Sequence, residues 1–292
     1  MTSHDCVFKL RKILRMKRIG HTGTLDPEVD GVLPICLGRA TKVAEYITNA
    51  GKTYEGEVTI GYSTTTEDAT GELVEEKRVD KAFSREEILN VLSKLTGRIT
   101  QTPPMFSAVK VNGKRLYEYA RQGIEVERPS REVTIYSIEL LDDRDSFFGE
   151  HLIRFRFRVS CSKGTYIRTL AVMIGEELGY PAHMSALTRI KSASFTLQDC
   201  ITLAEVEKLV ENGLIEQSLR PIEAALYYLP KYKISDKLVE KVKNGAVLPI
   251  PDDLLDVEEP VVVEAVNGEA LAIYVAHPQK QGLMKPSKVL KI

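Results

Sequence analysis

The sequence predicts an α+β fold, with a mixed, mainly antiparallel central sheet flanked by helices and a small β-rich domain at the C-terminus. Helix-like and strand-like segments mix along the 292 residues without the regular strand–helix repeat of parallel α/β proteins. Residues 153–159 alternate apolar side chains with three arginines, a pattern typical of a strand with one buried face. Beyond residues 228–234 most segments are strand-like, so we expect domains at 1–230 and 231–292.

The helices are predicted from apolar spacing and from signals at their ends. Capping boxes pair Ser84 with Glu87 and Thr202 with Glu205, and a glycine follows each of these helices. A third helix follows Ser235. Near the N-terminus an apolar helix face opposes six basic side chains, which are Lys9, Arg11, Lys12, Arg15, Lys17 and Arg18.

Two further strand patterns support the predicted sheets. In residues 54–60, Tyr54, Val58 and Ile60 fall on one face of a strand. Residues 261–266 and 270–276 flank an Asn-Gly pair, the commonest short hairpin signal.

Composition excludes several classes of protein. No apolar run approaches 18 residues and the first residues lack a signal-peptide pattern, so we expect no membrane span and a cytoplasmic protein. The four cysteines lie far apart and no metal-binding or phosphate-loop motif occurs, which predicts neither a metal nor a cofactor. The net charge of −1 is unusual for a nucleic-acid binder, but the basic run at 9–18 predicts a local positive face.

The densest unusual segment is Gly20-His21-Thr22-Gly23-Thr24-Leu25-Asp26-Pro27, with Gly31 after it. Pro27 restricts Asp26 to extended backbone, which fixes this carboxylate on a stiff turn. Taken alone, an Asp-Pro pair more often marks an Asx-turn than a reactive site.

A second unusual segment, Lys163-Gly164-Thr165-Tyr166-Ile167-Arg168, joins strand 153–159 to a helix. Arg168 falls in the first helical turn, where a cation opposes the helix dipole. We therefore expect an anionic partner, either a phosphate or a carboxylate such as Asp26. A solvated arginine at a frayed helix end is the simpler alternative.

Together with Lys52-Thr53-Tyr54 and Ser185-Ala186-Leu187-Thr188-Arg189, these segments resemble the TruB family of pseudouridine synthases over nearly the whole chain. The resemblance implies the pseudouridine-synthase fold and a PUA-like RNA-binding domain at 231–292. In that family a Lys-Pro-x-Gly segment precedes the match to Thr2–Asp5, whereas the printed sequence begins at Met1.

The resemblance also implies the reaction, which isomerises uridine 55 in the T-loop of tRNA to pseudouridine without a cofactor. The reacting base must be flipped out of the folded loop. The implied partner is the T-arm of tRNA, bound by a monomer without a guide RNA. Expected phosphate contacts are the basic run at 9–18, the arginines of 154–158, an insertion at about 110–131 and the basic segment 280–291.

Site residues follow from the matched positions. Asp26 resembles the catalytic aspartate, which attacks either the ribose or the uracil, and Arg168 resembles its ion-pair partner. Tyr54 resembles the aromatic residue that stacks on the uracil, although an ordinary core tyrosine would fit the same pattern.

The substrate-binding residues implied by the resemblance are His21, Tyr166, Leu187 and Lys163. His21 would fill the space left by the flipped nucleotide, and Leu187 would line the uracil pocket. A structural histidine and plain packing are the simpler readings of these two residues.

Two other functions fit parts of this pattern. A non-catalytic RNA-binding protein would not need Asp26, Tyr54 and Arg168 together. An aspartate-dependent nucleosidase would release free uracil.

Overall fold

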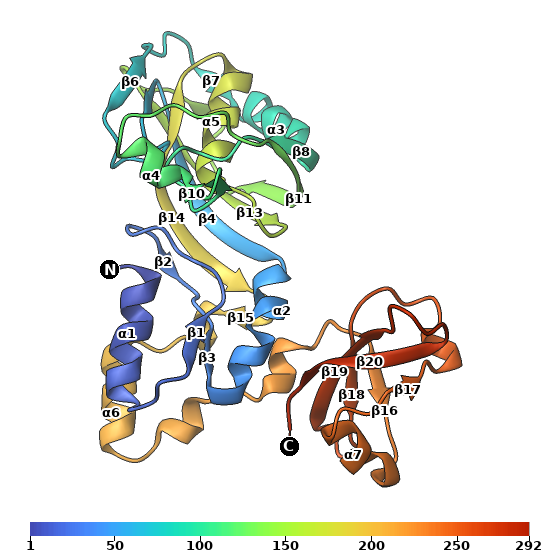
Figure 1. Cartoon of the computed structure of the whole chain (residues 1–292). Helices are drawn as coiled ribbons and strands as arrows, with labels where there is room; N and C mark the ends of the chain where they lie inside the picture. The colour runs from blue at the N-terminus through green and yellow to red at the C-terminus, as the bar shows by residue number, and fades with distance from the viewer. Residues whose placement is uncertain (292) are drawn as a thin grey trace. The chain divides into compact units, whose positions relative to one another are not determined.

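The structure is a computed structural model that describes residues 1–291 (Figure 1). The chain forms two compact units, which are described separately. The central-sheet unit contains Glu28–Val32 and Asn49–Gln198, and the terminal unit contains Met1–Pro27, Leu33–Thr48 and Asp199–Ile292.

A seven-stranded sheet organises the central-sheet unit. Its strand order is β15-β14-β4-β13-β11-β8, with β2 paired to β14 off this path. Every pairing is antiparallel except that of β2 with β14, which confirms the mixed, mainly antiparallel sheet. The strands are β2 (Asp30–Gly31), β4 (Lys52–Ile60), β8 (Gly97–Gln101), β11 (Arg131–Leu140), β13 (Ile153–Cys161), β14 (Ala182–Ser192) and β15 (Phe195–Thr196).

One face of this sheet is buried by two helices, α3 (Arg85–Lys94) and α5 (Ile167–Leu178). β13 alternates as predicted. Phe155 and Phe157 are buried, and the residues that alternate with them, Arg154, Arg156 and Arg158, face outward. Burying each such large apolar side chain contributes about 1.5–3 kcal/mol to stability. This inner face is the one that positions the predicted site residues of the unit.

Shorter elements surround the sheet. The hairpin of β5 (Tyr62–Thr64) and β6 (Leu73–Glu76) follows β4, and β7 (Phe83–Ser84) pairs with β12 (Ser146–Phe147). In the 110–131 segment, β9 (Lys110–Val111) and β10 (Lys114–Arg115) form a hairpin that leads into α4 (Leu116–Ala120).

In the terminal unit, α1 (Ser3–Ile13) packs on α6 (Leu203–Glu211), as Val7, Leu10 and Val206 form one buried cluster. The predicted capping boxes at Ser84–Glu87 and Thr202–Glu205 are both present. Thr2 and Asp5 form another one at the start of α1. The remaining elements are β1 (Ile19–His21), β3 (Ile35–Leu37), η1 (Gly38–Val43), α2 (Ala44–Asn49, whose last residue belongs to the other unit), η2 (Leu197–Asp199, whose first two residues also belong to it), η3 (Ile215–Ser218) and η4 (Ile222–Ala225).

The C-terminal residues form a five-stranded sheet with its own core, which includes Val263, Leu271 and Tyr274. The predicted hairpin is present, although its first strand ends at Glu264. The boundary at 230–231 stays a prediction. The elements are β16 (Lys231–Lys233), α7 (Asp236–Lys243), β17 (Leu248–Pro249), η5 (Asp252–Leu254), β18 (Val261–Glu264), β19 (Ala270–Ala276) and β20 (Leu283–Val289).

Within residues 1–291, no helix is both long enough and apolar enough to cross a membrane.

Candidate functional site

The loop that carries Asp26 is held on its N-terminal side by helix α1. The Leu25 N–H donates to Ser3 Oγ at 2.8 Å, and Ser3 Oγ lies 3.4 Å from Leu25 O. Ser3 is the first residue of α1 and is buried. Pro27 restricts the backbone on the other side. The backbone of Asp26 is therefore restrained at both neighbours, and its side chain is half-buried.

His21 lies in the same unit, at the end of β1, where it pairs with Ile35 of β3. The next residue, Thr22, donates both its N–H (3.2 Å) and its hydroxyl (3.1 Å) to Pro34 O. These bonds fix the start of the 20–31 loop.

Gly31 explains how the far end of this loop joins the central sheet. It lies in the left-handed region (φ +106°), and a Cβ atom there would stand 2.2 Å from Arg189 O. Only glycine allows β2 to approach β14 this closely. The buried Arg189 side chain reinforces the contact, because its Nε donates to Val32 O at 2.7 Å.

Tyr54 and Leu187 lie together on the inner face of the sheet. Leu187 pairs with Gly56 in the register of β4 and β14, two residues from Tyr54. A Cβ at Gly56 would stand 3.2 Å from Leu187 Cδ1 and 3.0 Å from Phe157 Cζ. Because Gly56 has no side chain, none stands between Tyr54 and Leu187 at this position. Both residues are half-buried against the core.

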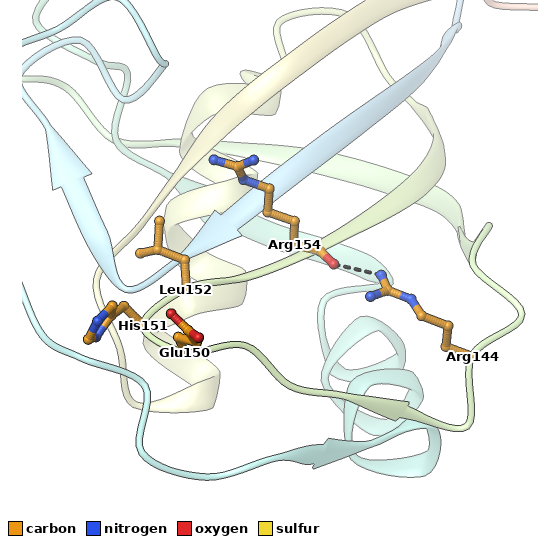
Figure 2. A pocket seen from close by; sticks show the side chains of 5 residues that line it. All are labelled: Arg144, Glu150, His151, Leu152 and Arg154. Carbon is orange, nitrogen blue, oxygen red and sulfur yellow. Dashed lines mark hydrogen bonds between the residues drawn. The ribbon is translucent and has the colours of Figure 1, made fainter.

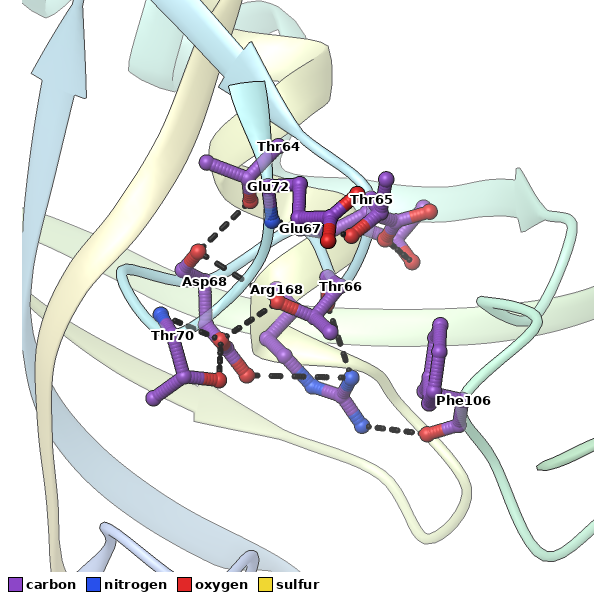
Figure 3. Close-up of polar contacts among 10 residues, drawn as sticks. Thr64, Thr65, Thr66, Glu67, Asp68, Thr70, Glu72, Phe106 and Arg168 are labelled. Atoms are coloured by element: carbon purple, nitrogen blue, oxygen red, sulfur yellow. Dashed lines mark hydrogen bonds and ion pairs between the residues drawn. The ribbon is translucent and has the colours of Figure 1, made fainter. Parts of the chain in front are cut away.

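Arg168 is only 4% exposed, which excludes the solvated arginine considered above. It lies in the first turn of α5, and its guanidinium donates to Thr66 O (2.9 Å) and Phe106 O (3.0 Å). Its Nη1 lies 3.9 Å from Asp68 Oδ2 (Figure 3). These acceptors offset the unfavourable position of a cation at a helix N-terminus.

Asp68 is itself held by a threonine-rich turn. Its Oδ1 accepts from Thr66 Oγ1 (2.6 Å), Thr70 Oγ1 (2.6 Å) and the Thr70 N–H (3.0 Å) (Figure 3). Burial acts to raise the pKa of Asp68, but these hydrogen bonds and the charge of Arg168 together hold the pKa below its usual value of 3.8. The carboxylate is therefore ionised at neutral pH and oriented toward the arginine.

The neighbouring Glu67 behaves in the opposite way. Burial raises its pKa above the usual 4.5, although the hydroxyl of Thr169 donates to Glu67 Oε2 at 2.7 Å. Its backbone has φ +61°, an uncommon conformation for a residue with a side chain. The turn is thus tied to α5 through two consecutive acidic residues.

Tyr166, which precedes α5, is fixed through its backbone. The Gln101 side chain accepts from the Tyr166 N–H (2.9 Å) and donates to Tyr166 O (3.1 Å). The Arg131 guanidinium lies 4.9 Å from the centre of the Tyr166 ring. Nearby, exposed Lys163 donates to Asn49 Oδ1 at 3.0 Å.

The 110–131 segment interleaves cations with aromatic rings. Asn112 and Gly113 both have positive φ, which makes the tight turn of the hairpin. Arg115 and Arg121 lie 5.8 and 5.3 Å from the Tyr117 ring. Exposed cations beside aromatic rings are typical of surfaces that bind single-stranded RNA.

Two of the arginines on the outer face of β13 are engaged by acids, whereas Arg154 Nε donates to Thr59 Oγ1 at 3.2 Å. Arg158 pairs with Glu55 at 2.7 Å and with Glu139 at 3.2 Å, and Arg156 lies 3.6 Å from Glu55. This neutralisation makes the outer face a weaker phosphate site than its arginine pattern suggested.

A surface hollow of about 400 Å³ lies on this unit but contains none of the predicted site residues (Figure 2). Arg144 Nη2 donates to Arg154 O at 2.7 Å beside it. The lining residues are Arg144, Glu150, His151, Leu152 and Arg154.

Five of the seven predicted residues lie in the central-sheet unit, whereas Asp26 and His21 lie in the terminal unit. The meeting of Asp26 with Arg168 stays a prediction. The sequence did not predict the partners of Arg168 and Tyr166. Arg168 contacts Thr66, Asp68 and Phe106, and Tyr166 is bound by Gln101. The run Thr64-Thr65-Thr66-Glu67-Asp68 indicates an acid anchored in a turn, but nothing in it identifies the cation.

Comparison with known proteins identifies the family. The profile described as "TruB family pseudouridylate synthase (N terminal domain)" matches residues 11–167, and that described as "tRNA pseudouridylate synthase B C-terminal domain" matches residues 168–227. The tRNA pseudouridine synthase B of Geobacillus thermodenitrificans is 61% identical over 291 residues, covering 100% of this chain and 96% of that protein. The protein of the same name from Bacillus pumilus is 59% identical over 292 residues, covering 99% and 94%.

Two solved structures share the fold. One is a Cbf5-Nop10-Gar1 complex, with a TM-score of 0.75 and 30% identity over 99% of this chain and 82% of that chain. The other is an H/ACA RNP bound to a substrate RNA containing 2′-deoxyuridine, with a TM-score of 0.74 and 27% identity over 100% and 82%.

Proposed function

The chain belongs to the TruB family of pseudouridylate synthases, and we propose that it isomerises uridine 55 in the T-loop of tRNA, with Asp26 as the catalytic carboxylate. The observation that carries this proposal is the buried Arg168. Burying an arginine against two carbonyls and a carboxylate costs desolvation free energy, and the fold alone does not require such a burial. The sequence resemblance assigns the role of the family's active-site arginine to this residue.

Base flipping comes first in the proposed reaction. The uracil must leave the folded loop, which costs a few kcal/mol, and stacking on an aromatic ring returns about 1–3 kcal/mol. Tyr54 would supply that ring, and Leu187 on the same face of the sheet would line the pocket for the base.

The chemistry then requires an ionised carboxylate in a site closed to water. Asp26 would attack the ribose or the uracil, so that a bond to its carboxylate forms and the N1–C1′ bond breaks. The base then turns, a C5–C1′ bond forms, and the bond to Asp26 breaks, which restores the free carboxylate. The proton on C5 is finally lost and N1 gains one, so the isomerisation needs no external reactant. Arg168 would favour the charged form of Asp26.

Affinity for the T-arm would come from phosphate contacts on several elements. The exposed cations of 9–18, the 110–131 segment and the lysines of the PUA-like residues 231–291 are the proposed contacts. Such contacts position RNA by its shape and backbone.

Asp26→Asn tests the catalytic assignment. We expect tritium release from 5-tritiated uridine in tRNA to stop while RNA binding persists. Asp30→Asn is a matched control on the same loop, since exposed Asp30 accepts a hydrogen bond from Thr188 that an asparagine oxygen can also accept, and it should retain turnover. Turnover by Asp26→Asn would refute the assignment, and free uracil from the unsubstituted protein would indicate a nucleosidase instead.

Position and partner are tested with the unsubstituted protein. We propose that it acts in the cytoplasm as a monomer without a guide RNA. Pseudouridine mapping of a single tRNA transcript, incubated with the protein and no other RNA, should show modification at position 55 alone. A requirement for a second RNA would contradict this proposal.

A further inference from the structure

We propose that His183 is a positioning residue that holds the turn carrying Asp68 in place against Arg168. His183 lies in β14 opposite Thr59 and is fully buried. Its Nδ1 lies 3.1 Å from Tyr62 O, and its ring packs against the Tyr62 ring with a centroid separation of 4.3 Å and a tilt of 42° between the planes. The inference rests on the proposed function, because its main readout is pseudouridine formation.

The hydrogen bond to Tyr62 defines the state of the imidazole. A carbonyl oxygen can only accept, so Nδ1 carries the proton and Nε2 bears a lone pair. Within residues 1–291, Nε2 of His183 is buried and has no hydrogen-bond partner. An apolar ring would avoid this unsatisfied nitrogen, so packing alone does not account for a histidine. The feature that an apolar ring would lose is the hydrogen bond to Tyr62.

A second hydrogen bond from β14 holds the same segment. Met184, the next residue of β14, donates its N–H to Glu67 O at 3.0 Å. Consecutive residues of a rigid sheet strand therefore hold residues 62 and 67. Between and just beyond these anchors lie Thr66 O and the carboxylate of Asp68, which both contact Arg168.

The turn needs such anchoring because its backbone is not relaxed. Glu67 has a positive φ, and Thr64 Oγ1 donates back to Asp68 O at 2.5 Å (Figure 3). A conformation of this kind persists only where its surroundings over-determine it. Release of the Tyr62 anchor would let Asp68 withdraw from the arginine while the sheet and α5 stay folded.

Several groups surround the imidazole. Thr59 of β4 and Tyr62 of β5 are its neighbours, and Arg154 of β13 and Asp68 act on it electrostatically. Burial and the charge of Arg154 hold the pKa of His183 below its usual 6.5, against the opposing effects of Tyr62 O and Asp68. A proton added at lower pH would place a second cation near Arg154 in a buried site.

The first test separates the hydrogen bond from the ring. His183→Phe keeps the ring and removes the donor, whereas His183→Asn keeps a donor near the position of Nδ1. We expect His183→Phe to lower the single-turnover rate of pseudouridine formation about 10-fold to 100-fold, with RNA affinity within about twofold of normal. His183→Asn should recover most of this loss. A normal rate in His183→Phe, or an equal loss in both variants, would overturn the inference.

A second pair of variants covers the case in which His183→Phe does not fold. Tyr62→Leu keeps the carbonyl of residue 62 but removes the ring that holds the imidazole of His183 against it, and Tyr62→Phe is its matched control. Only Tyr62→Leu should lower the rate at unchanged RNA affinity. Equal rates in the two variants would count against the inference.

The third test is the pH profile. The rate of the unsubstituted protein, measured with RNA in excess of its dissociation constant, should fall as pH drops below 6.5. His183→Asn cannot gain a proton and should lack this fall, whereas the exposed His151→Asn should keep it. An acid-side fall that survives in His183→Asn would overturn the inference. An unsubstituted protein that makes no pseudouridine would instead refute the proposed function.

Discussion

Arginines on the two sides of the central sheet have contrasting environments. Arg168, on the helix packed against the inner face, is 4% exposed and lies 3.9 Å from its carboxylate partner. Arg158, on the outer face, has a side chain 41% exposed and a shorter ion pair of 2.7 Å with Glu55. The shorter pair contributes less to the stability of the fold, because water screens the charges of the outer pair but not those of the inner pair. Exposure, more than distance, distinguishes the arginine proposed for the site from the surface one.

Arg168→Lys breaks the inner side of this comparison and should have the largest effect. A lysine cannot reach Thr66 O, Phe106 O and Asp68 together, because it lacks the planar fork of arginine. We expect the single-turnover rate to fall about 10²-fold to 10³-fold. Arg158→Lys is the matched control and should stay within about twofold, as measured by tritium release under the same conditions.

Asp68→Asn should have the next largest effect. It leaves Arg168 buried without its carboxylate, so we expect about 1–3 kcal/mol less stability toward denaturant and a lower single-turnover rate. The pKa of Asp68 is lower in the folded protein, so the ionised form stabilises the fold. This contribution is complete above pH 3.8 and is lost as pH falls through the lower folded value.

The two proteins should therefore converge in stability at the acid end of a pH series. A stability difference that persists unchanged well below pH 3.8 would show that the charge of Asp68 is not its cause.

Glu55→Gln should have the smallest effect and sharpens the outer side of the comparison. It removes the carboxylate shared by Arg156 and Arg158, and exposed pairs of this kind contribute about 0.2–1 kcal/mol. We expect unchanged activity and a stability loss within that range, reduced further in high salt. A loss comparable with that of Asp68→Asn would contradict the importance given to exposure.

Local features of the fold could be predicted from the sequence. The capping boxes at Ser84–Glu87 and Thr202–Glu205 join residues three apart, so both partners are visible in one short window. The buried and exposed positions of β13 follow in the same way from a period of two.

The candidate site could be predicted only in part. Arg168 and its need for an anion follow from its place in a first helical turn. Its partners Thr66 and Asp68 lie about 100 residues away, in a turn whose threonines indicate an anchored acid and nothing more. His183 carries no signal at all, because a lone histidine in a strand pattern can be buried or exposed.

The sequence by itself determined which residues are available for catalysis, where helices begin, and which side of each strand is apolar. These properties depend on backbone preferences and periodicity within about ten residues. Only the tertiary structure decided that Arg168 is desolvated, that Asp68 is ionised beside it, and that Arg158 is neutralised by Glu55. The physical reason is that solvent exposure and charge environment are set by segments that meet in space, and these are separated along the chain by distances over which local patterns carry no information.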